Sequence, residues 1–247
     1  MGVKELIMTI QATHLPKIYG FNKSSEAGPD NFAPSIFLGG CNFRCPYCMN
    51  SKLVKMVDVK EVSLDTVKEF VIENKCEWVN ISGGEPTLQL DDELCELIEE
   101  IAGWGCKVAM STNGTGDLIC IPLLKYVTMD LKTDSTTYAK DYCFDGLRHP
   151  MSLIISTMEL LRWWKKEYDF DYEFRTTLYK PLVNLHNIDK IAKFIKKRDK
   201  WVLQPFRATK CMLSEDAEDV EPYSKEEMEE LKAVAEEYCD NVSLRYV

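Results

Sequence analysis

Short apolar runs alternate with amphipathic stretches along the chain from residue 34 onward. Runs typical of buried strands cover residues 35–38, 78–82, 107–111, 126–131, 172–178 and 201–205. Several of these runs are almost continuously apolar, as expected for strands that are buried on both faces. In the stretches between them, apolar residues recur every three or four positions, which is the spacing of one face of a helix. The alternation predicts parallel β-α-β units.

Start signals support several of the predicted helices. Ser63 is a predicted N-cap, and Ser224 with Glu227 predicts a capping box at the start of the last helix. The predicted buried helix faces are Leu64, Val67 and Val71; Leu90, Leu94, Leu97, Ile98 and Ile101; Ile188, Ile191 and Ile195; and Met228, Leu231, Ala235 and Tyr238. By contrast, residues 1–33 have no such pattern, and the Ser, Gly, Asn, Asp and Pro residues of 24–34 predict a loop.

Six strand–helix units are too few for a closed eight-stranded barrel. A doubly wound sheet and an open barrel both agree with the pattern. We predict an α/β fold with a mostly parallel sheet, a partial (β/α)6 TIM-like barrel that is open on one side. It forms a single domain, with residues 34–247 in the barrel and 1–33 as an irregular segment. Ligands of such folds bind at the carboxyl ends of the strands, and the motifs described below follow predicted strands.

Composition narrows the class of protein. The chain has 247 residues, of which 45% are hydrophobic, enough for one large core. Its net charge of −10 argues against a nucleic-acid partner, because nonspecific binding requires a basic surface. No window approaches the roughly 20 apolar residues of a membrane span, and the N-terminus lacks the pattern of a secretory signal. We therefore predict neither a membrane nor a nucleic-acid partner. The ten cysteines, most of which have to stay reduced, predict a cytoplasmic protein.

Ten cysteines are present, and most stand singly in apolar stretches. A cysteine in such a place is usually a small core residue. A disulfide framework is not predicted, because that use of cysteine belongs to small secreted domains. The residues interpreted as core cysteines are Cys76, Cys95, Cys106, Cys120 and Cys239.

Cys41, Cys45 and Cys48 stand close together after the first predicted strand, with the spacing Cys-x-x-x-Cys-x-x-Cys. Thiolates on one short loop can surround an iron–sulfur cluster. A four-iron cluster usually has four cysteine ligands, so three of them leave one iron open. An open coordination position is what distinguishes a catalytic metal site from a closed structural one.

Two other interpretations of these cysteines remain. A zinc site would require a fourth cysteine or histidine nearby, but the next one downstream is Cys76. The segment Cys45-Pro46-Tyr47-Cys48 is also the active-site sequence of glutaredoxins, in which two thiols perform disulfide exchange. Glutaredoxins are much shorter than this chain, and that interpretation gives Cys41 no role.

The cysteine spacing resembles the signature of the radical S-adenosylmethionine (SAM) superfamily. The resemblance implies that Cys41, Cys45 and Cys48 hold a 4Fe-4S cluster whose fourth iron chelates the methionine portion of SAM. It implies reductive cleavage of SAM to a 5′-deoxyadenosyl radical. Tyr47, the aromatic residue before the last cysteine, is implied to lie near the adenine.

Two further motifs follow the next two predicted strands. Each of them could also be an ordinary turn without a ligand. The first resembles the Gly-Gly-Glu-Pro motif of the superfamily, which binds the methionine ammonium, and the second matches a strand end that faces SAM in relatives. Their residues are Gly83, Gly84, Glu85 and Pro86 in the first motif, and Ser111, Thr112 and Asn113 in the second.

Charged side chains end the later strands. Asp130 and Lys132 share one side of a strand because side chains alternate, and burying both would be costly unless they pair or bind a ligand. They resemble the Asp-x-Lys of glycyl-radical-enzyme activases, which contacts the cofactor region; a simple ion pair is the alternative. Arg175 needs a partner, which a cofactor carboxylate would supply. Gln204 is predicted to contribute to the pocket floor.

The order and spacing of these motifs from residue 34 to 247 are similar to those of glycyl-radical-enzyme activating proteins. The segments 172–177, 202–207 and 242–245 are similar to the activating protein of the anaerobic ribonucleoside-triphosphate reductase. The resemblance implies that the radical abstracts hydrogen from a glycine of an anaerobic ribonucleotide reductase. It also implies an external electron donor such as flavodoxin or ferredoxin. A radical SAM enzyme that modifies a small molecule or a ribosomal peptide is one alternative, and a thiol–disulfide oxidoreductase is another.

Two positions differ from the formate-lyase activases. Those proteins have Asp-Gly-Pro-Gly before the first strand, whereas residues 27–30 here read Ala-Gly-Pro-Asp. They also have an Asp-Thr pair where this chain has Ser111 and Thr112. That aspartate helps to hold a monovalent cation, so the sequence does not predict such a cation here.

Overall fold

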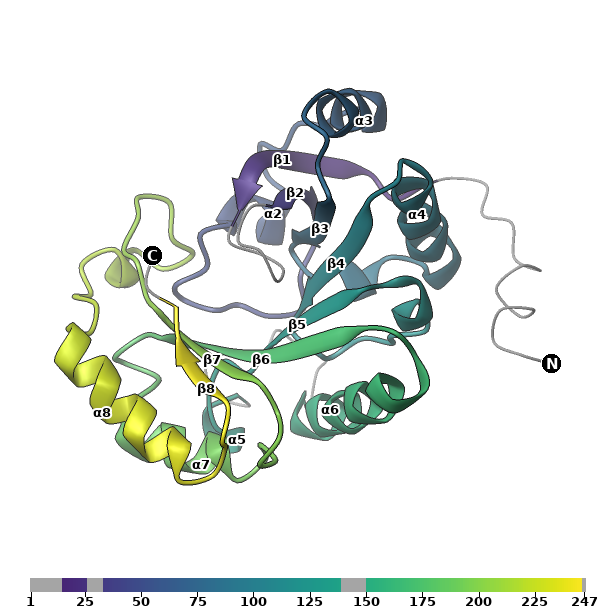
Figure 1. Ribbon diagram of the computed structural model, residues 1–247. Helices are drawn as coiled ribbons and strands as arrows, with labels where there is room; N and C mark the ends of the chain where they lie inside the picture. Colours follow the sequence, from purple (N-terminus) through teal and green to yellow (C-terminus); the bar gives the residue numbers. More distant parts are fainter. Residues whose placement is uncertain (1–14, 26–32, 139–149, 246–247) are drawn as a thin grey trace.

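The structure is a computed structural model that describes residues 15–25, 33–138 and 150–245. Within these residues, eight strands form one curved sheet whose order follows the sequence. Only the first pair is antiparallel. The strands are β1 (Ile18–Ser25), β2 (Ala33–Leu38), β3 (Trp78–Gly83), β4 (Lys107–Thr112), β5 (Tyr126–Asp130), β6 (Asp171–Leu178), β7 (Trp201–Pro205) and β8 (Val242–Leu244). β1 and β8 are the edges of this open sheet (Figure 1), so the predicted partial barrel is confirmed.

Two strands extend beyond the six that the sequence predicts. β1 lies inside the segment 1–33, so the prediction that this whole segment is irregular is wrong for Ile18–Ser25. β1 has no clean alternation, because its pairing with β2 is interrupted by two register shifts. β8 has three residues, too few for any period, and pairs with β7. That the chain forms a single domain stays a prediction.

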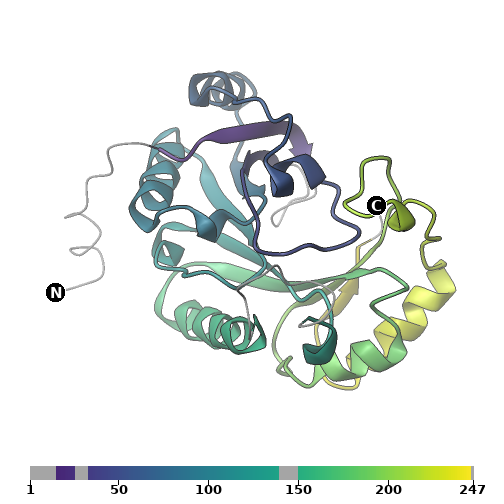
Figure 2. The same cartoon turned by 180° about the vertical axis from the view of Figure 1, so that it is seen from behind.

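The larger helices lie around the outside of the curved sheet (Figures 1 and 2). They are α3 (Leu64–Glu73), α4 (Asp91–Gly103), α6 (Pro150–Glu167), α7 (Leu185–Ala192) and α8 (Lys225–Glu236). The predicted N-cap Ser63 and the capping box of Ser224 and Glu227 are confirmed. α7 ends at Ala192, so Ile195 is buried beyond the helix. No described helix is long and apolar enough to cross a membrane.

The two faces of the sheet differ in polarity. One set of alternate residues is apolar and buried: Ile36, Leu38, Val79, Ile81, Val108, Met110, Val127, Met129, Phe174 and Leu203. The other set is polar although it is buried as well. Asn80 donates to Ser35 at 3.0 Å, and Thr128 faces Glu173. The apolar runs thus belong to strands buried on both faces, but the face enclosed by the curl of the sheet is largely polar.

The register of the parallel strands brings polar residues to neighbouring positions at the carboxyl ends. Asp130 on β5 stands opposite Arg175 on β6, and Thr177 on β6 stands opposite Gln204 on β7. Parallel strands end at the same edge of a sheet. The candidate site residues on these strands therefore lie close together at that edge of the sheet.

Cys95 and Cys120 form a disulfide between α4 and the turn before η2 (Ile121–Leu123). The interpretation of these two as single core cysteines is therefore wrong, although both are buried. Twenty-five residues separate them. Their pairing depends on how α4 lies against the chain after β4, which sequence spacing does not reveal.

Glu173 is a fully buried carboxylate that joins three elements on the polar face. It accepts hydrogen bonds from Tyr126 at 2.7 Å and Arg245 at 3.0 Å, and Lys200 Nζ lies 3.1 Å away. Burial by itself raises the pKa of Glu173, but Arg245 and Lys200 outweigh burial and hold the pKa below its ordinary value. The carboxylate thus ties β6 to the last two strands.

We expect Glu173→Gln to lower the free energy of unfolding by about 3 kcal/mol at neutral pH, because Arg245 is left with no carboxylate at a buried site. Lys200 is 36% exposed, so it recovers hydration and limits the loss. Because the pKa of Glu173 is depressed, its contribution is present at neutral pH and is lost as the pH falls through the folded-state value. Urea unfolding across this pH range measures both effects.

Glu77→Gln is the matched control, because Glu77 pairs with Lys107 at 2.6 Å on the surface, where both side chains are at least half exposed. We expect no measurable change in this variant, since surface ion pairs contribute little. Equal losses in the two variants would contradict the role given to Glu173.

Candidate active site

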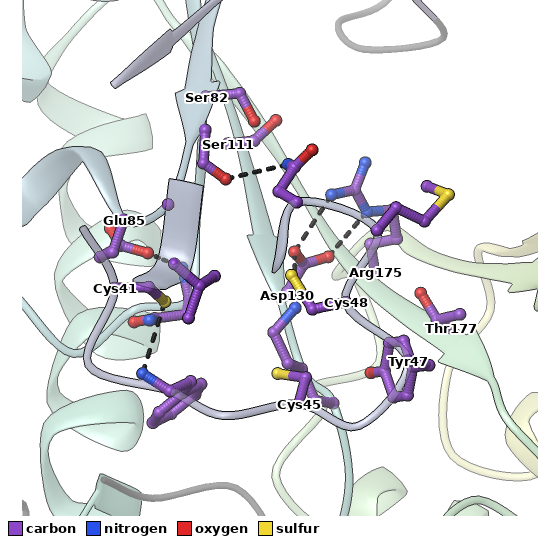
Figure 3. A pocket seen from close by; sticks show the side chains of 18 of the residues that line it. Cys41, Cys45, Tyr47, Cys48, Ser82, Glu85, Ser111, Asp130, Arg175 and Thr177 are labelled. Atoms are coloured by element: carbon purple, nitrogen blue, oxygen red, sulfur yellow. Dashed lines mark hydrogen bonds and ion pairs between the residues drawn. The ribbon is translucent and has the colours of Figure 1, made fainter. Parts of the chain in front are cut away.

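A cavity of about 290 Å³ opens at the carboxyl ends of the strands. Cys41, Cys45 and Cys48 lie along one loop that borders it, and Asp130 and Arg175 face it from β5 and β6 (Figure 3). All of the predicted site residues line this cavity except Pro86. The lining residues from the sequence prediction are Cys41, Cys45, Tyr47, Cys48, Gly83, Gly84, Glu85, Ser111, Thr112, Asn113, Asp130, Lys132, Arg175 and Gln204.

Pro86 is buried at the start of η1 (Pro86–Leu88), where it can begin a helix because it needs no N–H partner. Sequence reasoning missed several lining residues, among them Asn50 and Thr177. Asn50 follows the last cysteine and donates to the Gly83 carbonyl at 3.1 Å. A position just after a cysteine motif was the only available signal for it. Residues 27–30, where the sequence differs from the formate-lyase activases, lie outside the described residues.

The loop that carries the three cysteines is held in place by backbone pairing and by aromatic packing. Leu213 N–H donates to the Cys48 carbonyl at 3.1 Å, and Ser214 N–H donates to the Pro46 carbonyl at 3.0 Å. The Tyr47 ring packs against two aromatic side chains from the ends of β6 and β7, with centroid distances of 5.0 Å to Tyr179 and 6.2 Å to Phe206. The loop is thus a wall of the cavity that is held by residues 213–214 and by aromatic side chains after β6 and β7.

The three thiols are free of disulfides and largely enclosed. Burial raises the pKa of Cys41 to about 11 and raises the pKa of Cys45 and Cys48 as well, although Lys132 opposes this in all three cases. Disulfide exchange at neutral pH requires a thiol whose pKa is lowered. The environment of Cys45 and Cys48 therefore does not favour the thiol–disulfide oxidoreductase interpretation.

The donor set fits an iron–sulfur cluster better than a single ion. Among the described residues, no three Cys, His, Asp or Glu side chains are grouped closely enough to bind one metal ion. In a cubane each thiolate binds a different iron, so the sulfurs surround a core and do not meet at one point. Three free thiols bordering one cavity, with the Lys132 ammonium to balance their charge, meet that requirement.

The glycines at the end of β3 allow two loops to approach each other. A Cβ on Gly83 would lie 2.3 Å from the Leu38 carbonyl oxygen, and one on Gly84 would lie 1.6 Å from the Gly40 carbonyl oxygen. Gly83 also has a φ of +120°, which side chains rarely adopt. The close approach that these glycines allow is therefore to the backbone before the cysteines.

Glu85 is almost completely buried, and four hydrogen bonds hold its carboxylate. Oε1 accepts from the N–H and hydroxyl of Thr87 at 3.3 and 2.7 Å, and from the Thr112 hydroxyl at 2.6 Å. Oε2 accepts from the Asn113 N–H at 2.6 Å. Burial raises the pKa of Glu85, and the four donors oppose that rise. Glu85 thus joins the ends of β3 and β4, and it is one of the residues that line the cavity.

Asp130 lies between two cations on the wall of the cavity. It accepts from Arg175 Nε at 2.7 Å and Nη2 at 3.1 Å, and from Lys132 Nζ at 3.0 Å. Burial by itself raises the pKa of Asp130, but Arg175 and Lys132 hold it well below its ordinary range. The expected shared face of Asp130 and Lys132 is confirmed. Arg175 has a protein partner as well, the carboxylate directly across the strand pair, and its pairing with a cofactor carboxylate stays a prediction.

Gln204 completes the wall on the side of β7. Its amide donates to the Thr177 hydroxyl at 2.8 Å, which fixes the orientation of both side chains. The cavity is therefore bordered by three thiols and by the buried Glu85 carboxylate. It is also bordered by the Asp130 carboxylate with its two cationic partners. Such a site can hold a metal cluster beside a ligand that carries both positive and negative groups.

The chain is similar in sequence to proteins of one known superfamily. The sequence profile described as the radical SAM superfamily matches residues 35–195. A Methanocaldococcus jannaschii protein named as a candidate glycyl-radical enzyme activating enzyme is 32% identical over 89% of this chain and 91% of its own length. A second protein of that organism, named in the same way, is 28% identical over 83% and 77%. A 7-carboxy-7-deazaguanine synthase of Thermoplasma acidophilum is 29% identical over 52% and 62%.

Solved structures share the fold. QueE from Escherichia coli superposes with a TM-score of 0.57 and 15% identity, covering 98% of each chain. SuiB from Streptococcus suis, in a crystal structure with S-adenosylmethionine bound, superposes with a TM-score of 0.59 and 14% identity. That match covers 84% of this chain and 48% of SuiB. At these identities the likeness establishes the architecture alone.

Proposed function

Because this chain belongs to the radical SAM superfamily, we propose that it installs a glycyl radical on a partner enzyme, an anaerobic ribonucleotide reductase. The superfamily assignment makes the protein a radical SAM enzyme whose cofactors are a 4Fe-4S cluster and SAM. When bound, these cofactors supply the reductive cleavage that yields methionine and a 5′-deoxyadenosyl radical. The electron comes from an external donor such as flavodoxin or ferredoxin.

The proposal gives each part of the cavity a task. Cys41, Cys45 and Cys48 hold the cluster, and the contacts of their loop to residues 213–214 and to Tyr179 keep the loop in place. Gly84 and Glu85 orient the methionine portion of SAM, together with the strand end at Ser111, Thr112 and Asn113. Tyr47 lies beside the adenine. The cationic surplus of Lys132 and Arg175 over Asp130 attracts the carboxylate of SAM.

One observation carries the proposal: three free thiols border a single cavity at the carboxyl ends of parallel strands. The partner class rests on the relatives named as glycyl-radical activating enzymes, which match most of this chain.

Anaerobic incubation with an anaerobic ribonucleotide reductase, SAM and a reductant tests the partner. We expect a glycine-centred doublet in the electron paramagnetic resonance spectrum and one methionine released for each radical formed. Replacing the radical-bearing glycine of the reductase by alanine removes its Cα radical site and serves as the control. SAM cleavage without a doublet for any such reductase would overturn the partner assignment and leave the superfamily assignment intact.

A second candidate function is the modification of a small molecule. The similarity to the 7-carboxy-7-deazaguanine synthase of Thermoplasma acidophilum favours it. The polar wall of Asp130, Lys132 and Arg175 would then anchor the substrate. SAM cleavage that a small heterocycle stimulates, and that no reductase stimulates, would support this function over the first.

A further inference from the structure

Asn42, Asn113 and Thr115 form a closed ring of hydrogen bonds between two loops. Asn42 lies between the first two cysteines, and the other two residues follow β4. Asn42 Nδ2 donates to Thr115 Oγ1 at 2.7 Å, and that hydroxyl donates to Asn113 Oδ1 at 2.6 Å. Asn113 Nδ2 donates back to Asn42 Oδ1 at 2.8 Å and closes the ring. Each group is both oriented and polarised by the next, so the ring acts as one unit.

Asn113 also connects this ring to a third loop. Its backbone N–H donates to Glu85 Oε2 at 2.6 Å, and the neighbouring Thr112 hydroxyl donates to Glu85 Oε1 at 2.6 Å. Asn113, Thr115 and Glu85 are all buried. The chain after β2, the chain after β3 and the chain after β4 are thus joined at Asn113, although their sequence separations range from 28 to 71 residues.

We propose that Asn42 and Thr115 are positioning residues that fix the separation between the cysteine loop and the strand end that faces SAM. Asn113 lines the cavity, whereas Asn42 and Thr115 are not among its lining residues and act through Asn113. The proposal rests on the assignment of the cluster to the cysteine loop and of SAM to the strand ends. A ligand that contacts both loops binds less tightly when their separation varies, because it must select one arrangement from several.

Thr115→Val and Thr115→Ser are the matched variants, since valine has nearly the same shape as threonine without the hydroxyl and serine keeps the hydroxyl. They are studied in the full chain, reconstituted with iron and sulfide without oxygen. The readouts are iron content, thermal midpoint and SAM affinity, the last followed through the spectrum of the reduced cluster. We expect Thr115→Val to keep its iron and to bind SAM about tenfold more weakly, the equivalent of one buried hydrogen bond. Thr115→Ser stays within about twofold of the unmodified protein.

Asn42→Ala breaks the same ring at a half-buried residue, and it replaces Thr115→Val in the experiment if that variant does not fold. We expect Asn42→Ala to lose as much SAM affinity as Thr115→Val. The double variant is expected to bind SAM no more weakly than the weaker-binding single variant, because either change alone opens the ring. Unchanged SAM affinity with a lowered thermal midpoint would contradict the proposal, because the ring would then stabilise the fold without affecting SAM binding. Losses that multiply in the double variant would also overturn the proposal. None of these readouts needs a partner protein, so failure of the partner assignment would be distinguishable.

Discussion

Replacing Cys45 by alanine is expected to abolish the 4Fe-4S cluster and to lower SAM cleavage by more than about 1000-fold. Cys45 is the most deeply buried of the three thiols, so no water or neighbouring side chain can take its place easily. Removing groups that merely support a metal ligand already costs 10- to 100-fold. Loss of a ligand removes the site of electron transfer itself. Iron content, the visible spectrum and methionine release measure the effect.

Cys239→Ala is the control for this experiment. Cys239 is also buried and free, but it lies after α8, and its thiol faces the Asp199 carbonyl at 3.1 Å. We expect this variant to lose some stability and to keep its cluster. A Cys45→Ala protein with normal iron content and normal SAM cleavage would contradict the assignment of Cys45 as a ligand.

Asp130→Asn is expected to have the second largest effect. Arg175 and Lys132 would then share a buried wall without a carboxylate, and each of the three side chains is less than a fifth exposed. Breaking a buried ion pair from one side costs roughly 3–5 kcal/mol of stability. We also expect SAM cleavage to fall by about 10- to 100-fold, because the two cations would no longer be held in place. Urea unfolding and methionine release measure the two losses.

The pH dependence of this variant follows from the depressed pKa of Asp130. The stabilisation is present above the ordinary pKa of an aspartate and is lost only as the pH falls toward the lower folded-state value. The unmodified protein is therefore expected to gain more stability over the variant as the pH rises from strongly acidic to neutral. Asp169→Asn, which removes a fully exposed partner of Lys125, provides the control and should leave SAM cleavage unchanged. Equal effects of the two substitutions would contradict the role of the buried ion group.

The sequence predicts the strands that carry the site because one face of each strand packs in the apolar core, so the core sets its pattern. The sequence does not predict β1 and β8, because β1 is an irregularly paired edge strand and β8 has only three residues. The cysteines, the Gly-Gly-Glu motif and the residues at the ends of β4 to β7 reach one cavity because parallel strands end at one edge.

Partners across the fold could not be predicted in the same way. Arg175 pairs with Asp130 because β5 and β6 are neighbours in one particular register. Asn42 lies more than 70 residues from both of its partners, and Cys95 lies 25 residues from Cys120. Such contacts depend on which strands and loops become neighbours in the folded sheet and not on any local period. The roles of the individual site residues in cofactor binding stay predictions.

Mössbauer spectroscopy of iron-57 in protein kept free of oxygen, with and without SAM, tests the central claim most directly. The account predicts a cubane cluster in which one iron site alone changes its spectrum when SAM is added, because only that iron lacks a cysteine ligand. A cluster that does not respond to SAM, or reconstituted protein without any cubane, would contradict it.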